Sequence, residues 1–246
     1  LNMKRILLTI SYDGTNYSGW QKQKNAVTVQ GEFDKACSTL FKTDVESIGA
    51  SRTDAGVHAF GQRAVIDVDT SIPAEKIPLA LNPLLPDDIV VTHAEEVGAD
   101  FNPRFNALKK TYEYSIYNAP FRNPLYRNYS EYVRYELDLD SMRTACEAFV
   151  GEHDFRAFCA SGNSSKTTVR TIYSLDIEKE GDFIKIRVTG NGFLYNMVRI
   201  IAGTLIYVGE GRIAPDDLPE IIASGDRRKA GKTAGPSGLV LVKIMY

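Results

Sequence analysis

The sequence predicts an α+β protein built from two tandem split βαβ units with mostly antiparallel sheets. Three observations favour this fold class. Short runs alternate apolar with polar residues, as at Ala64, Ile66 and Val68, which is typical of strands with one buried face. Longer runs repeat apolar residues every three or four positions, which is typical of helices. The order strand, helix, strand, strand, helix, strand occurs twice along the chain.

The first half of the chain contains one set of these six elements. We expect a strand at 3–12, a helix at 28–43, strands at 45–50 and 62–69, a short helix at 74–82 and a strand at 88–97. The first helix is indicated by apolar residues at spacings of four, three and four: Val29, Phe33, Ala36 and Leu40. Pro83 ends the second helix, because proline has no amide hydrogen to continue it.

The second half repeats the order. We expect a strand at 109–118, a helix at 139–150, strands at 168–180 and 183–190, a helix at 194–208, a short helix that begins at Pro215, and a strand at 238–246. Gly181 and Asp182 join the middle strands as a hairpin turn. The boundary between the halves falls near 100–108, which gives an N-terminal domain of residues 1–105 and a C-terminal domain of residues 106–246. Two such ferredoxin-like or RRM-like units would flank a central cleft that is open to a ligand.

The composition is typical of a globular protein with an ample core. Of the 246 residues, 43% are hydrophobic and 24% are charged. Since no apolar run approaches the length of a membrane span and the N-terminus lacks the pattern of a signal peptide, we expect a cytoplasmic protein. The formal net charge of −2 does not indicate a nucleic-acid binder, but a basic groove can be offset by acidic residues on another face.

Cysteine and histidine spacing favours neither a disulfide framework nor a metal site. The three cysteines are far apart and odd in number, and they are best interpreted as reduced thiols in or near the core: Cys37, Cys146 and Cys159. The three histidines form no ligand-spaced pair with each other or with a cysteine: His58, His93 and His153. We therefore expect no metal.

A functional loop is indicated by GASRTDAGVHAFGQ, residues 49–62, which carries Arg52, Asp54 and His58 within seven residues. On the predicted map this stretch connects two strands, and loops braced in this way often carry function. A carboxylate such as that of Asp54 can act as a general base or as a covalent nucleophile. The alternative is that Asp54 only caps a turn through its side chain.

The same stretch closely resembles the signature of the tRNA pseudouridine synthase A family. The resemblance extends through YDGTNYSGWQKQ, FNPRFNALKKTYEYSIYN, GEHDFRAFCA, GNGFLYNMVRIIAGTLIYVG and AGPSGLVLVKI, so it covers nearly the whole chain in order. It departs at Ser51, where the family more often has glycine. The resemblance implies a cofactor-independent isomerase that converts uridine to pseudouridine at positions 38, 39 and 40 in the anticodon arm of tRNA, and that acts as a homodimer.

The resemblance also assigns roles to individual residues. Asp54 matches the nucleophile, and Tyr112 matches the tyrosine that stacks on the target base and is a candidate to help move its C5 proton. Arg199 matches the arginine that pairs with the catalytic carboxylate, and Arg52 matches an arginine that engages the RNA. We expect His58 to shape the loop or to contact RNA. Four apolar residues are candidates to line the uracil pocket, with plain core packing as the alternative: Phe193, Leu194, Met197 and Leu239.

Two other functions compete with the isomerase. A non-catalytic RNA-binding module could share the architecture, but it would have no need of a carboxylate facing phosphates. An enzyme that acts on a free nucleotide could use the same carboxylate. The stretch GDRRKAGKT, residues 225–233, resembles a P-loop but has one residue too many between its glycines and follows no strand, so we reject a nucleotide triphosphate site. It remains a candidate to touch tRNA phosphates.

Overall fold

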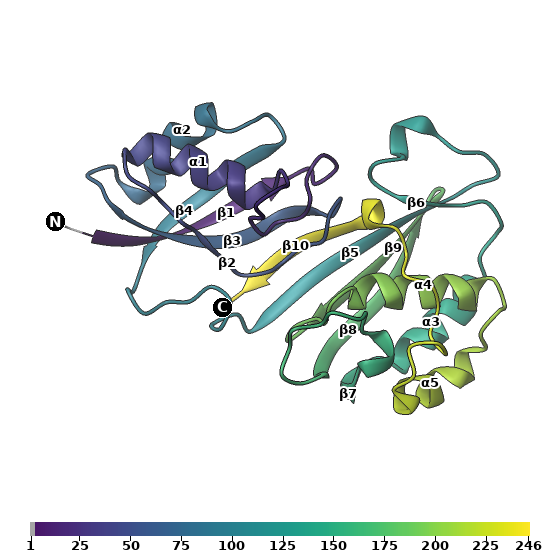
Figure 1. Cartoon of the computed structure of the whole chain (residues 1–246). Helices are drawn as coiled ribbons and strands as arrows, with labels where there is room; N and C mark the ends of the chain where they lie inside the picture. Colours follow the sequence, from purple (N-terminus) through teal and green to yellow (C-terminus); the bar gives the residue numbers. More distant parts are fainter. Residues whose placement is uncertain (1–2) are drawn as a thin grey trace. The chain divides into compact units, whose positions relative to one another are not determined.

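The computed structural model describes residues 3–246 and shows a mixed α+β protein whose β-structure is large, open and mostly antiparallel (Figure 1). The α+β class expected from the sequence is confirmed. By its contacts the chain divides into two compact units, one of Leu1–Leu108 with Val240–Tyr246 and one of Lys109–Leu239. The final strand therefore groups with the first unit, although it stands at the end of the second half of the sequence.

The first unit is a sheet covered by helices on one face, as Figure 1 shows for α1 and α2. β1 pairs antiparallel with β3 on one side and with β4 on the other, and β2 pairs antiparallel with β3. β10 lies parallel to β3, with Val240 opposite His58. The elements are β1 (Met3–Tyr12), α1 (Val29–Phe41), β2 (Ile48–Gly49), β3 (His58–Asp69), α2 (Ile77–Leu81), β4 (Ile89–Val97) and β10 (Leu239–Met245), with 3-10 turns at Ala74–Lys76 and Asn82–Leu84.

α1 forms where its apolar periodicity and its caps predict. The Thr28 side chain accepts a hydrogen bond from the Gly31 amide, which satisfies a donor at the helix N-terminus. The helix ends as Lys42 takes a left-handed conformation with φ of 54°. Val29, Phe33 and Cys37 are fully buried, so the expected apolar face is the one that packs on the sheet.

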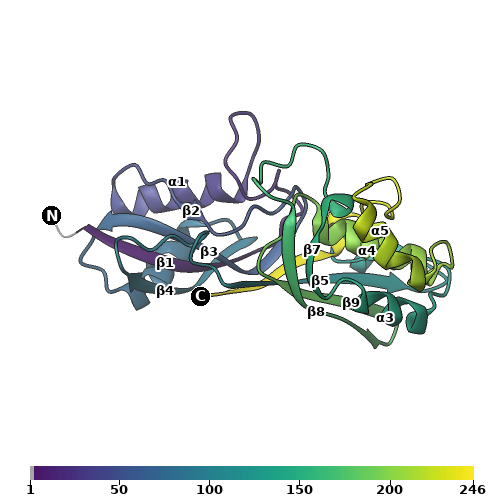
Figure 2. The same cartoon turned by 90° about the horizontal axis from the view of Figure 1, so that it is seen from below.

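The second unit has the strand order β5, β9, β8, β7 (Figure 2). The neighbouring strands β5 and β9, β9 and β8, and β8 and β7 are each antiparallel. β6 pairs in parallel with β5. The elements are β5 (Lys109–Asn118), β6 (Glu131–Val133), α3 (Leu139–Glu147), β7 (Gly151–Asp154), β8 (Val169–Glu180), β9 (Phe183–Gly190), α4 (Met197–Gly209) and α5 (Leu218–Ser224), with 3-10 turns at Pro124–Tyr126, Arg156–Phe158, Pro215–Asp217 and Pro236–Gly238.

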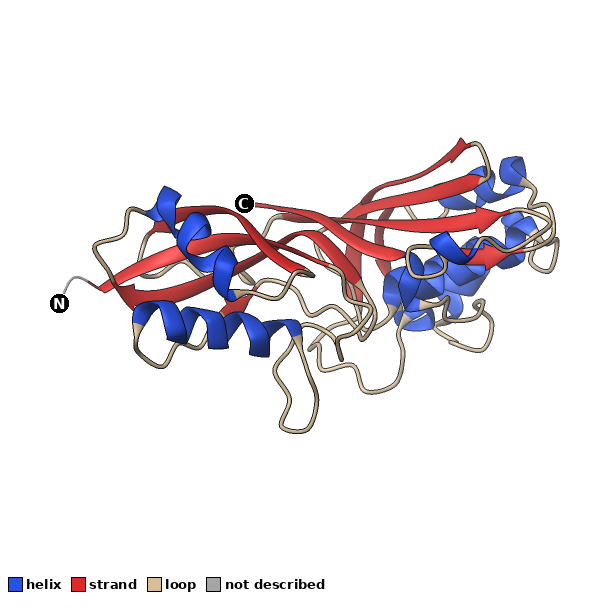
Figure 3. Ribbon diagram, turned by 90° about the horizontal axis from the view of Figure 1, so that it is seen from above, coloured by secondary structure: helices blue, strands red, loops and turns tan. Residues whose placement is uncertain are grey.

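The helices of the second unit gather on one side of its strands (Figure 3). α3 and α4 lie side by side, with α3 against β8 and α4 against β5. Almost every residue of α4 is buried, including Ile200, Ala202 and Leu205. α4 begins at Met197 instead of residue 194, because Asn196 just before it has a left-handed φ of 59° that no α-helix continues.

Asp34 on α1 carries an energetic cost that a substitution can remove. Its side chain is buried, and its Oδ1 accepts a hydrogen bond from the Ser47 amide at 3.1 Å, whereas Oδ2 has no hydrogen-bond partner within residues 3–246. Burial raises the pKa of this carboxyl, because a buried carboxylate loses its hydration. The folded state therefore holds the Asp34 proton more tightly than the unfolded chain does. The contribution of the protonated Asp34 carboxyl to the free energy of unfolding is fully present at pH values below its pKa in the unfolded chain. It is lost as the pH rises through the pKa of this carboxyl in the folded protein.

We expect Asp34→Asn to stabilise the protein at pH 7 by about 1 kcal/mol, because a neutral amide is cheaper to bury than a carboxylate. Thermal unfolding should show a melting temperature about 2–4 °C higher than that of the wild type. The difference should shrink as the pH falls and the wild-type carboxyl takes up its proton. Equal melting temperatures at pH 7 and a lower one for the variant at acid pH would contradict this account.

Candidate active site

The predicted site residues of the first unit lie on the connection between β2 and β3. Residues 50–57 form an irregular loop, and His58 is the first residue of β3. Asp54 is partly buried in this loop, and Arg52 is exposed. The carboxylate therefore stands where a strand braces the chain on each side, as the sequence predicts for a functional loop.

A second segment, residues 12–20, fixes the backbone on both sides of Asp54. The Trp20 amide donates to the Thr53 carbonyl at 3.1 Å, and the Gly56 amide donates to the Tyr17 carbonyl at 3.2 Å. The Tyr12 and Thr53 hydroxyls share a hydrogen bond of 2.7 Å. The aromatic residues of YDGTNYSGW are thus buried supports of the loop, since Tyr12, Tyr17 and Trp20 are each less than a tenth exposed.

Two glycines of that segment let it approach the loop closely. A Cβ atom at Gly14 would stand 2.0 Å from the Val57 carbonyl oxygen. Gly19 has a φ of +85°, and a Cβ atom there would stand 2.6 Å from the Thr53 carbonyl oxygen. Only glycine fits at either position without moving the backbone beside Asp54.

His58 supports the same loop from the start of β3. Its side chain is nearly buried, and its Nδ1 accepts a hydrogen bond from the Gly14 amide at 3.0 Å. The same nitrogen lies 3.1 Å from Asp13 Oδ1, a distance that would suit an ion pair only if Nδ1 carried a proton. Both interactions cannot form through one nitrogen at once. We favour the amide bond, because the backbone fixes the position of that hydrogen.

In the second unit, the structure brings Tyr112 and Phe193 together. The two rings meet edge to face, with centroids 5.3 Å apart and an interplanar angle of 86°. Leu194 and Met197 are buried beside each other, because the Leu194 amide lies 3.5 Å from Met197 Sδ. Leu239 is buried at the start of β10, directly after a glycine whose backbone lies against the Tyr114 ring.

Arg199 is held in a fixed orientation in the first turn of α4. Its Nε donates to the Ala234 carbonyl at 2.8 Å, and one terminal nitrogen donates to Asn196 Oδ1 at 2.9 Å. The Ala234 amide in turn donates to the Arg199 carbonyl at 3.0 Å. Because a guanidinium is planar, two acceptors at two edges define the plane of the whole group.

The loop that supplies Ala234 is itself pinned, and its supports were not predicted from the sequence. Arg227 donates to the Gly231 carbonyl at 2.8 Å and to the Thr233 hydroxyl at 3.0 Å. Glu131 of β6 accepts from Lys232 Nζ at 2.8 Å and from the Gly235 amide at 3.2 Å. The stretch GDRRKAGKT is therefore a brace on α4, and no motif in the sequence distinguishes its Arg227 from the neighbouring basic residues.

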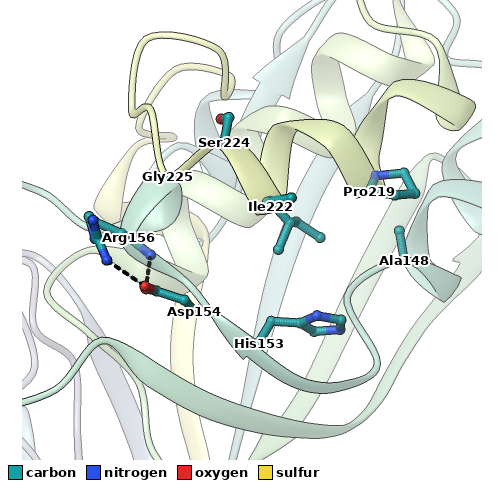
Figure 4. A pocket seen from close by; sticks show the side chains of 9 residues that line it. Ala148, His153, Asp154, Arg156, Pro219, Ile222, Ser224 and Gly225 are labelled. Atoms are coloured by element: carbon teal, nitrogen blue, oxygen red, sulfur yellow. Dashed lines mark hydrogen bonds and ion pairs between the residues drawn. The ribbon is translucent and has the colours of Figure 1, made fainter.

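A pocket of about 250 Å³ lies between β7 and α5, and none of the residues that line it is a predicted site residue (Figure 4). Asp154 and Arg156 at its edge satisfy each other, with a terminal nitrogen of Arg156 2.7 Å from Asp154 Oδ2. Within residues 3–246, no three His, Cys, Asp or Glu side chains gather so as to hold a metal ion. Over the same part of the chain, no helix has the length and apolar character needed to cross a bilayer.

Comparison with known proteins identifies the family. The profile of the tRNA pseudouridine synthase family matches residues 8–106 and 145–246. The chain belongs to the tRNA pseudouridine synthase family. Relatives named tRNA pseudouridine synthase A include those of Caldicellulosiruptor saccharolyticus, 53% identical over 244 residues, and Ruminiclostridium cellulolyticum, 54% identical over 245 residues. In both cases the match covers 99% of this chain and 100% of the relative.

The ranges matched by the family profile contain the candidate catalytic residues except Tyr112. The matched ranges contain Arg52, Asp54 and Arg199 together with the segment that braces the Asp54 loop. Tyr112 falls in the stretch between the two ranges, and its assignment depends on the similarity to the full-length relatives. The tRNA pseudouridine synthase family is therefore shown along both units.

Proposed function

We propose that this chain isomerises uridine to pseudouridine in tRNA, at positions 38, 39 and 40 of the anticodon arm, without a cofactor. The observation that carries the proposal is the full-length similarity to tRNA pseudouridine synthase A proteins, within which Asp54 stands on a loop that residues 12–20 hold on both sides. A fixed carboxylate is what nucleophilic catalysis needs, because the reacting atoms must already be aligned when the substrate binds.

In this proposal Asp54 is the nucleophile that assists cleavage of the glycosidic bond. The N1 to C1′ bond of the uridine breaks, the detached uracil turns and a C5 to C1′ bond forms; C5 then gives up its proton to solvent, and N1 ends with a proton in place of its bond to the ribose. Arg199 orients the carboxylate, Tyr112 stacks on the base and helps to remove the C5 proton, and Arg52 engages the RNA backbone. The edge-to-face contact of Tyr112 with Phe193 supports this role, because it fixes the orientation of the ring that would hold the base.

The remaining predicted residues complete the pocket. Phe193 and three buried residues, Leu194, Met197 and Leu239, form the apolar wall that holds the detached uracil and excludes water from it. His58 shapes the Asp54 loop through its bond to the Gly14 amide. The target uridine must leave the helical stack to reach this wall, since its reacting atoms are otherwise covered by neighbouring bases.

The two halves of the chain form two split βαβ units, and each supplies part of the active site. Residues 1–105 supply the carboxylate, and residues 106–246 complete the cleft. The strand order β4, β1, β3, β2 in the first unit supports this architecture, because a split βαβ unit places β3 between β1 and β2. The enzyme acts in the cytoplasm as a homodimer. A single 27 kDa species on analytical ultracentrifugation would contradict the dimer.

The proposal is tested with tRNA that carries tritium at C5 of its uridines. Isomerisation breaks the covalent bond between C5 and its hydrogen. Tritium should therefore appear in water at a rate that depends on the enzyme. Mapping of the product should place pseudouridine at positions 38, 39 and 40. Tight tRNA binding without tritium release would favour the non-catalytic RNA-binding module, and release from uridine monophosphate instead of tRNA would favour a nucleotide enzyme.

Arg227 provides a prediction on the brace that holds Arg199. We expect Arg227→Ala to lower kcat about tenfold with KM for tRNA nearly unchanged, because loss of its bonds to Gly231 and Thr233 loosens the loop that carries Ala234. The matched control is Arg228→Ala, which removes the same charge from an exposed side chain whose hydrogen bonds within residues 3–246 all go to Asp226. An equal rise in KM for both variants would show that the loop binds RNA through its charge.

A further inference from the structure

The stretch between β5 and α3, which includes β6, exposes an unusual amount of apolar surface within residues 119–135, referred to below as the 119–135 segment. Its Phe121 side chain is 81% exposed, Leu125 is 79% exposed and Tyr135 is 70% exposed. Tyr126 and Tyr129 are also exposed. Exposed large apolar groups that cluster in this way mark a surface that contacts another molecule.

Three arginines are interleaved with these side chains, and none of them is neutralised. Within the described residues, 3–246, no carboxylate forms an ion pair with Arg122, Arg127 or Arg134. Arg122 lies over the Tyr132 ring, 5.3 Å from its centroid, and Arg127 donates to the Pro124 carbonyl at 2.8 Å. By contrast, the exposed Arg143 and Arg228 each pair with an aspartate.

The one acidic residue of the segment does not offset these charges. Glu131 accepts hydrogen bonds from Lys232 Nζ and from the Gly235 amide, so its charge is already engaged by another cation. The segment is thus locally basic, although the whole chain has a formal charge of −2. Three neighbouring guanidinium groups without a carboxylate partner among the described residues are typical of a surface that binds a polyanion.

The backbone of the 119–135 segment is braced, so these side chains are presented in a defined arrangement. The Tyr126 ring packs against Tyr117 and Phe183, with centroids 5.2 Å and 4.8 Å away. The Asn118 side-chain Nδ2, just before the segment, donates to the Val133 and Tyr135 carbonyls, which ties the start of the segment to its end. The segment forms the teal loop near β6 in Figure 1. A preorganised surface loses less entropy on binding than a flexible one.

We infer that the 119–135 segment is a second tRNA-binding surface, which holds the substrate outside the target nucleotide. This inference rests on the proposed function. The arginines contact phosphates, and the exposed rings stack on bases that are not in a helix, which is how proteins combine electrostatic and stacking contacts on single-stranded RNA. A second copy of this chain is the alternative occupant, and the three arginines without a carboxylate partner among residues 3–246 favour a polyanion such as RNA over it.

The test measures the Kd for full-length tRNA as a function of salt concentration. Each of Arg122→Ala, Arg127→Ala and Arg134→Ala should weaken binding about threefold to tenfold at low salt and reduce the slope of log Kd against log salt by about 0.7–0.9. Phe121→Ala and Tyr135→Ala should weaken binding about tenfold with little change in slope, because stacking carries no charge. At saturating tRNA, kcat should stay at the wild-type value for all five variants.

Arg143→Ala is the matched control, and it should leave both Kd and slope unchanged, because Asp140 already neutralises the side chain. Circular dichroism of every variant should match that of the wild type, which checks that each one folds. Wild-type Kd and slope in the combined triple arginine variant would overturn the inference. So would a loss of the dimer on ultracentrifugation with the salt slope intact, which would assign the surface to a second copy.

The inference and the proposed function fail in different ways. If the wild type releases tritium while the triple variant binds tRNA as tightly as the wild type, only the second surface is refuted. If the wild type binds tRNA and releases no tritium, the isomerase is refuted, and the salt slopes still decide whether the 119–135 segment contacts RNA.

Discussion

Replacement of Asp54 by asparagine should reduce tritium release from labelled tRNA by at least about 10⁴-fold, the size of loss expected when a covalent nucleophile is removed. The amide keeps the shape of the side chain but cannot attack carbon. The Kd for tRNA should stay within about threefold of the wild-type value, because phosphate contacts and not this carboxylate supply the affinity. Single-turnover tritium release and filter binding measure the two quantities on the same preparation.

The control for this substitution is Asp44→Asn, which removes one carboxylate from an exposed position in the same unit. It should leave both release and binding unchanged. A joint loss of binding and activity in Asp54→Asn would contradict the nucleophile assignment. Such a result would show that Asp54 maintains the loop between β2 and β3, which is the turn-capping alternative that the sequence leaves open.

The segment YDGTNYSGW illustrates how a motif can serve a site without touching the substrate. Its glycines allow the chain to approach Thr53 and Val57, and its amide and carbonyl groups bond to the residues on either side of Asp54. Backbone hydrogen bonds of this kind fix a loop more firmly than side-chain packing alone, because they specify direction as well as distance. The position of Asp54 therefore depends on two separate stretches of sequence, its own loop and YDGTNYSGW. Neither motif by itself indicates that the two stretches are bonded to each other.

Strands and helices with strong periodicity were predicted well from the sequence. β5 and β9 have the bounds that their alternation indicates, and α1 lies within two residues of its expected range. β6 and β7 were missed, because three or four residues are too few to show a period. The grouping of β10 with the first unit was also missed, since strand pairing between distant segments leaves no local signal.

The candidate site shows the same limit. Asp54, Tyr112 and Arg199 stand in motifs, and resemblance could find them. Arg227 and Glu131 act through loop carbonyls and amides that become neighbours only when the chain folds. Residues that position others through the backbone are difficult to predict, because many side chains can donate to a carbonyl and the sequence does not say which one does.

The second large effect is expected at Arg199. Arg199→Lys should lower kcat about 10²-fold and Arg199→Ala about 10³-fold, with KM for tRNA changed little, as is typical when an oriented electrostatic partner of the reacting group is lost. Lysine keeps the charge but has a single ammonium, which cannot donate to the Ala234 carbonyl and Asn196 Oδ1 and also offer two parallel N–H groups to a carboxylate.

The pH dependence of kcat/KM separates this role from a structural one. If Arg199 keeps the nucleophilic carboxylate ionised, its removal favours the protonated form, so the acid limb of the profile should move to higher pH in Arg199→Ala and by less in Arg199→Lys. Arg212→Lys is the control, because that side chain is exposed and pairs with Glu210 at 3.4 Å. A uniform drop in rate at every pH, together with a lower melting temperature, would mean that Arg199 only holds α4 to the loop at Ala234.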